Sequence, residues 1–119
     1  MSAKTLIYGL LVGASMLCTA APTKIGPEKC KMCHKVQFDS WSISKHAKAT
    51  PVLDCEGCHG AGSDYKTAPV MKDMAAAMKA GLIMLTKADC AKCHGKGKVP
   101  AMTDANFAKV HAHKAKKAK

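Results

Sequence analysis

Residues 30–34 form the pattern Cys30-Lys-Met-Cys33-His34, in which two residues separate a pair of cysteines and a histidine follows the second. The pattern returns as Cys55-Glu-Gly-Cys58-His59 and as Cys90-Ala-Lys-Cys93-His94. The chain has seven cysteines, and Cys18 is the one outside these three repeats. A single copy could arise by chance, but three copies in 119 residues indicate one shared chemical purpose.

The order of residues in each repeat is typical of covalent attachment of c-type haem. Two thioether bonds join the cysteine sulfurs to one edge of the porphyrin, and the histidine that follows lies under the ring and binds iron. We therefore predict three haem c groups as cofactors. Their attachment residues are Cys30, Cys33, Cys55, Cys58, Cys90 and Cys93. Their proximal iron ligands are His34, His59 and His94.

Other uses of paired cysteines compete with this interpretation. A structural zinc site takes four ligands, so three pairs leave an odd set, and zinc does not need a histidine after every pair. A thiol–disulfide exchanger usually carries one such pair within a βαβ pattern, which this sequence lacks. Structural disulfides would leave the repeated histidine unexplained.

The composition predicts that haem replaces a conventional hydrophobic core. Aromatic residues make up 4% of the chain. Small domains with so little bulky apolar material are marginally stable unless something else staples them. Three porphyrin rings would supply the missing apolar surface. We predict a mostly α fold, namely a small haem-packed domain of short helices and long loops that is largely disordered without haem.

The two ends of the chain are expected to lie outside this domain. Residues 1–20 combine a positive charge at Lys4, a short apolar stretch and small residues near Ala20, as a secretory signal peptide does. Residues 21–113 then form the trihaem domain, and residues 114–119 form a basic tail. Export predicts a periplasmic or extracellular protein without stable membrane insertion after cleavage. Lipidation at Cys18 and an uncleaved N-terminal membrane anchor stay open as alternatives.

The chain is strongly basic, with 19 lysines, no arginine, 8 acidic residues and a formal net charge of +11. A nucleic-acid-binding function fits poorly, because arginine is absent, aromatic side chains that could stack on bases are few, and the first residues predict export. We expect no nucleic-acid partner. The lysines would instead steer the protein toward redox partner proteins that are acidic at the docking site.

The histidines outside the three repeats are candidates for the second axial ligands of the irons. Outside the three repeats lie His46, His111 and His113, which bring the total to six histidines, the number that three bis-histidine irons need. His46 follows His34 by twelve residues, about 18 Å along a continuous helix. We therefore expect His46 to bind the iron of a different haem, with an exposed surface histidine as the alternative.

The C-terminal histidines follow a predicted helix. Thr103 or Asp104 can cap its start, and Phe107, Val110 and His111 share one of its faces. His111 is therefore expected to be a second axial ligand. His113 either reaches another iron or belongs to the solvated tail.

Methionine could also serve as an axial ligand. Residues 67–81 predict one amphipathic helix, with Thr67 as its cap and Gly81 after its end. Its apolar stripe consists of Val70, Met71, Met74, Ala75 and Met78. We expect this stripe to pack against haem. Met102 is the more isolated candidate for methionine ligation.

Three further segments carry local signals. Residues 28–48 predict a helix interrupted near residues 40–44, and the glycine-rich stretch after His59 predicts a tight loop. Thr86 and Asp89 form a capping pattern that places the third repeat at the start of a helix.

At this level of detail the sequence resembles the multihaem cytochromes of the cytochrome c-554 family. The resemblance is carried by the three repeats, Phe38, Trp41, Ser44, His46 and Ala47, and segments 54–65, 70–83 and 107–113. It implies a helical domain with closely spaced haems, bis-histidine ligation of most of them by His46 and the final histidines, and periplasmic electron transfer. The chain departs from tetrahaem members in having three repeats, and in having Ala61 and Tyr65 where relatives often have proline and sometimes histidine.

We predict an electron carrier rather than an enzyme, because iron with both axial positions filled has no place for a substrate. Two alternatives stay open. One is a haem enzyme or gas-binding protein with one five-coordinate iron. The other is a self-assembling subunit of a cytochrome filament, in which a neighbouring subunit could supply a distal histidine.

Overall fold

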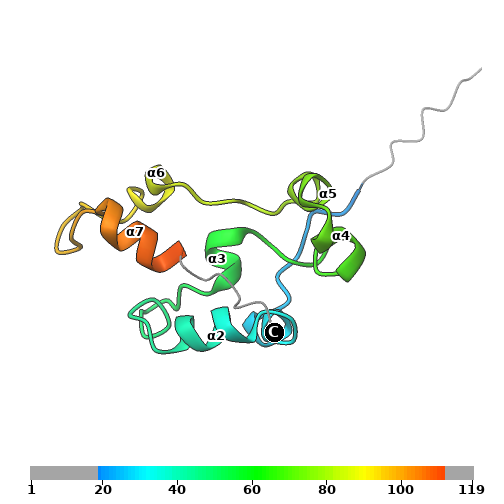
Figure 1. Ribbon diagram of the computed structural model, residues 1–119, viewed down its shortest axis with the longest axis horizontal. Helices are drawn as coiled ribbons and strands as arrows, with labels where there is room; N and C mark the ends of the chain where they lie inside the picture. Colours follow the sequence, from blue (N-terminus) through cyan, green and yellow to red (C-terminus); the bar gives the residue numbers. More distant parts are fainter. Residues whose placement is uncertain (1–18, 112–119) are drawn as a thin grey trace, which may run out of the picture.

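The structure is a computed structural model that describes residues 19–111, with side chains to residue 110. Within this range the chain forms short helices joined by loops, without strands (Figure 1). The helices are α1 (Pro27–Lys31), α2 (Lys35–Ser42), α3 (Cys55–His59), α4 (Ala68–Lys72), α5 (Met74–Lys79), α6 (Lys87–Cys90) and α7 (Asp104–His111). The predicted mostly α fold is confirmed. The predicted signal peptide, basic tail and His113 lie outside the described residues, apart from the last residues of the signal.

The second repeat, which forms α3, lies near the middle of the described molecule (Figure 1). α1 contacts both α2 and α3, and α4 contacts α5. Figure 1 shows α4 and α5 at one end of the molecule, α6 and α7 at the other, and α3 between them. Lys87 at the start of α6 forms an ion pair with Asp104 at the start of α7. Within residues 19–111, none of the helices has the length and apolar character needed to cross a membrane.

Very little of the described chain is buried. The buried apolar side chains are Phe38, Tyr65, Ala77 and Leu82. Large apolar side chains stay in solvent instead, with Met32 78% and Ile43 79% exposed. Full burial of one such side chain contributes about 1.5–3 kcal/mol, so this core is small against the entropy of ordering the chain. That finding supports the prediction that a bound group completes the core.

Residues 67–81 form two helices, so the prediction of a single helix is wrong. α4 ends at Lys72, and Asp73 takes an extended conformation with φ −104° and ψ 102°. The Asp73 carboxylate accepts a hydrogen bond from the backbone N–H of Ala76 at 3.0 Å. Aspartate at such a position caps a new helix start, so local capping outweighed the continuous apolar stripe.

Other helix ends follow their predicted signals. Thr86 and Asp89 form the expected capping box at the start of α6. Thr103 Oγ1 accepts from the N–H of Asn106 at 3.1 Å, which starts α7 one residue later. α2 ends at Ser42, within the predicted interruption. A second interruption, between α1 and α2, coincides with the end of the first repeat.

A buried carboxylate ties three segments together. Glu56 is 3% exposed. Its Oε1 accepts from the N–H groups of Ile25 at 2.9 Å and Gly62 at 2.8 Å, and its Oε2 accepts from Gly26 at 2.8 Å. Burial acts to raise the pKa of Glu56, but these three amide donors outweigh it, so the pKa lies below its ordinary value. Glu56 therefore joins the segment before α1 to the loop after α3.

Candidate haem-attachment site

Each repeat folds as a single helical turn. In the first, at the end of α1, the His34 N–H donates to the Cys30 carbonyl at 2.9 Å. In the third, at the end of α6, the His94 N–H donates to the Cys90 carbonyl at 2.8 Å. The second repeat is α3 itself. One turn of backbone thus carries both cysteines and the histidine in every repeat, as attachment to one porphyrin edge requires.

Two of the predicted proximal histidines are oriented for metal binding. The Nδ1 atom of His59 lies 2.9 Å from the Ile83 carbonyl, and Nδ1 of His94 lies 2.9 Å from the Pro100 carbonyl. A carbonyl only accepts hydrogen bonds, so Nδ1 carries the proton in both rings. The lone pair then remains on Nε2, which is how metal-bound histidines are usually held. These side chains fit the haem group predicted from the sequence.

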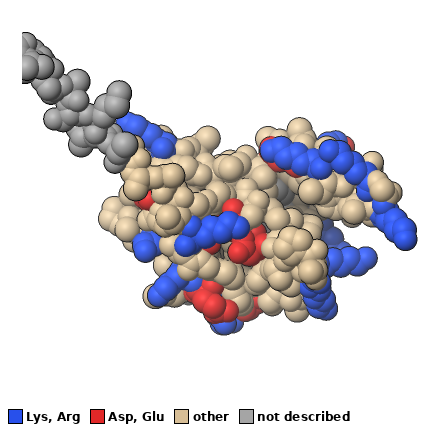
Figure 2. All heavy atoms as spheres, turned by 180° about the vertical axis from the view of Figure 1, so that it is seen from behind, with Lys and Arg blue, Asp and Glu red and all other residues tan. Residues whose placement is uncertain are grey.

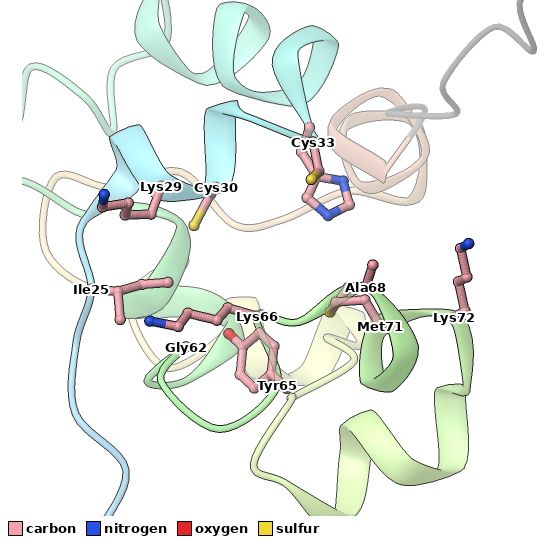
Figure 3. A pocket seen from close by; sticks show the side chains of 11 residues that line it. Ile25, Lys29, Cys30, Cys33, Gly62, Tyr65, Lys66, Ala68, Met71 and Lys72 are labelled. Carbon is pink, nitrogen blue, oxygen red and sulfur yellow. The ribbon is translucent and has the colours of Figure 1, made fainter.

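The first repeat borders an open pocket of about 320 Å³ with a mainly apolar wall. Cys30, Cys33 and His34 line one side of it. Figure 3 shows Cys30 and Cys33 above the cavity, with Tyr65 and Met71 on the opposite wall. A flat apolar group joined to the two thiols would have space and apolar surroundings here.

Tyr65 closes the floor of this pocket. Its hydroxyl donates to the carbonyls of Gly60 at 2.7 Å and His59 at 3.2 Å, which fixes the loop after α3. Burial is the main cause that raises the pKa of Tyr65 to about 12, so the phenol stays neutral. The resemblance had drawn attention to Tyr65 only as a departure from relatives.

The structure places His46 beside the third repeat. The ring centroids of His46 and His94 lie 6.0 Å apart, with the ring planes at 89°. The loop that carries His46 is held by Trp41, whose Nε1 donates to the Leu53 carbonyl at 2.8 Å, and the Leu53 N–H in turn donates to the His46 carbonyl. This placement agrees with the expectation that His46 serves a haem other than that of His34. Ligation itself stays a prediction.

Three of the described cysteines, Cys30, Cys55 and Cys58, are poor candidates for thiol–disulfide exchange. Burial is the main cause that raises the pKa of Cys30 to about 11, and burial also raises the pKa of Cys55 and Cys58. A thiol with a raised pKa is protonated at neutral pH and is a weak nucleophile. The described cysteines are unpaired, and residues 19–110 contain no His, Cys, Asp or Glu cluster able to hold a metal ion.

The second repeat lies between the other two. α1, which carries Cys30, contacts α3, and the electrostatic fields of Cys90 and Cys93 reach Cys58. The first and third repeats therefore both lie nearer to the second than to each other along the molecule (Figure 1). This order along the molecule was not predicted from the sequence.

Two predicted ligands, His111 and His113, and one residue that was not predicted, Glu56, complete the comparison between sequence and structure. His111 ends α7, but its side chain is outside the described set, as is all of His113. Their roles as ligands stay predictions. Glu56 was missed, because it is one of the two residues between the cysteines of the second repeat, and its sequence neighbours give no sign of its distant backbone partners.

Helical turns with paired thiols, histidines with a free Nε2 and an apolar pocket beside the first pair define a c-type cytochrome. The family model described as "Cytochrome c554 and c-prime" matches residues 29–54. The chain is 30% identical over 112 residues to "Cytochrome c-554" of Nitrosomonas europaea, covering 74% of this chain and 44% of that protein. The chain thus spans less than half the length of this relative. No solved structure matches the present chain. The chain belongs to the cytochrome c-554 family of c-type cytochromes.

Proposed function

We propose that the protein is an electron carrier, not an enzyme, with three covalently attached haem c groups. Haem iron cycles between ferric and ferrous states, and a carrier needs only to hold it and keep other ligands away. The observation that carries the proposal is the orientation of His59 and His94, whose Nδ1–H groups are both anchored on backbone carbonyls. Each ring thereby presents a fixed Nε2 at the end of a Cys-x-x-Cys turn.

His46 is the second axial ligand of the iron bound by His94 in this proposal. With metal–nitrogen bonds of about 2.0–2.1 Å, two imidazoles on one metal have ring centroids about 6 Å apart. The separation of 6.0 Å between His46 and His94 agrees with that value. Bis-histidine ligation favours a low reduction potential relative to His/Met ligation. His111 and His113 remain candidates for the other irons.

The proposed partners are redox proteins with an acidic docking surface. Figure 2 shows lysines projecting at several edges of one face, with a few acidic side chains among them. Opposite charges speed the encounter of two proteins and make its rate depend on salt. We place the protein in the periplasm, on the basis of the predicted signal peptide.

Mass spectrometry of the exported protein tests the haem count. We expect the mass of the polypeptide plus three haems, and a variant with Cys90 and Cys93 both replaced by alanine should be lighter by one haem. Unmodified polypeptide mass would refute the proposal. Carbon monoxide binding by the reduced protein would instead support an open iron and hence a haem enzyme or gas-binding protein. Sizing of the purified protein tests the filament alternative.

A further inference from the structure

The pocket beside the first repeat is lined by a thioether side chain as well as by the predicted proximal histidine. His34 lines one side of the cavity, and Met71 of α4 lines the other. Figure 3 shows Met71 on the wall opposite Cys33, the residue directly before His34. We propose that the thioether sulfur of Met71 is the second axial ligand of the iron bound by His34. This inference rests on the proposed function, since it presupposes haem at Cys30 and Cys33.

Other donor atoms in the pocket are less suitable. The Tyr65 hydroxyl is committed to the carbonyls of His59 and Gly60. Lys29, Lys66 and Lys72 also line the pocket, but an ammonium group has no lone pair to give. His46, the distal candidate with a described ring, lies beside His94 instead. A methionine thioether is neutral and is an established haem ligand type.

The position of Met71 is fixed by its surroundings. Its N–H donates to the Thr67 carbonyl at 2.9 Å in the first turn of α4. Its side chain packs against the buried cluster of Tyr65, Ala77 and Leu82. Met74 and Met78 on α5 are 49% and 53% exposed and do not line this pocket. Met74 and Met78 belong to the same apolar stripe as Met71 and therefore serve as control positions.

Ligation by Met71 would make electron transfer among the three haems directional. A thioether raises the potential of haem iron relative to a second imidazole. The haem of His34 and Met71 would then have a higher potential than that of His94 and His46. Since the second repeat lies between the other two, electrons entering at the third haem would move through the second and settle on the first.

The test compares the holo-protein with Met71→Leu, Met71→His and Met74→Leu. We expect the ferric wild-type protein to show the far-red sulfur-to-iron charge-transfer band of a His/Met haem. Met71→Leu should lose the band and let reduced protein bind carbon monoxide at one haem. Met71→His should lose the band, keep the iron closed to carbon monoxide, and lower the highest potential in a redox titration. Met74→Leu should match wild type.

A wild-type protein without the band, or a band that persists in both Met71 variants, would overturn the inference. Haem mass separates this failure from failure of the proposed function. Three attached haems without the band refute Met71 alone, whereas absence of attached haem refutes the electron-carrier proposal. If Met71→Leu does not accumulate, Met71→His decides the outcome, because it keeps a ligand over the iron.

Discussion

Replacing Glu56 by glutamine tests whether one buried carboxylate holds the segment before α1 in place. The carboxylate accepts from the amides of Ile25, Gly26 and Gly62 at 2.8–2.9 Å. A glutamine keeps one oxygen but turns an NH₂ group toward at least one amide donor. Loss of a hydrogen bond to a charged acceptor, with a buried donor left unpaired, costs about 1–3 kcal/mol. We expect the holo-protein to lose about 2–3 kcal/mol of unfolding free energy.

Denaturant titration, followed by helical circular dichroism and by haem absorbance, measures this loss. Glu28→Gln is the matched control, because the Glu28 side chain is 74% exposed and should change stability by less than about 0.5 kcal/mol. The lowered pKa of Glu56 adds a pH signature. Its stabilisation is present above the ordinary carboxyl pKa and is lost as pH falls through the lowered value. Equal stability of both variants at neutral pH would refute the argument.

Three further outcomes follow from the structure. Replacing His46 by methionine should leave all haems attached and raise the potential of one; unchanged redox titration curves would argue against its ligand role. Expression without haem-attachment machinery should yield an unfolded, degraded product, because few side chains are buried; a compact apo-protein seen by circular dichroism would contradict this. Electron transfer to an acidic partner should slow as salt rises, while a rate independent of ionic strength would exclude lysine steering.

Features set by neighbouring residues were predictable from the sequence. The capping box of Thr86 and Asp89 and the start of α7 after Thr103 involve contacts over three residues. The helical turn of each repeat is equally local. Asp73 shows the limit of such reasoning, because two local signals compete there. The apolar stripe favoured one helix, whereas the aspartate side chain favoured a new start, and capping prevailed.

Contacts between distant segments were not predictable from the sequence. Glu56 binds backbone amides at residues 25 and 26, and a backbone amide leaves no mark on residue type. The sequence predicted that His46 serves a haem other than that of His34, from the length of a continuous helix, whereas the structure ends α1 at Lys31 and α2 at Ser42. The sequence could not select His94, because that choice depends on how the loop after α2 packs near the third repeat.

The same sparse packing links fold and function. A chain that buries Phe38, Tyr65, Ala77 and Leu82 as its apolar core must obtain the rest of its apolar contacts elsewhere. Porphyrins attached at three turns would supply them, and the contact between α1 and α3 would bring the first two porphyrin edges near each other. Close edges favour electron transfer between haems. Residues that complete the core would then also define the electron path, so a change in packing near Met71 should alter both stability and potential.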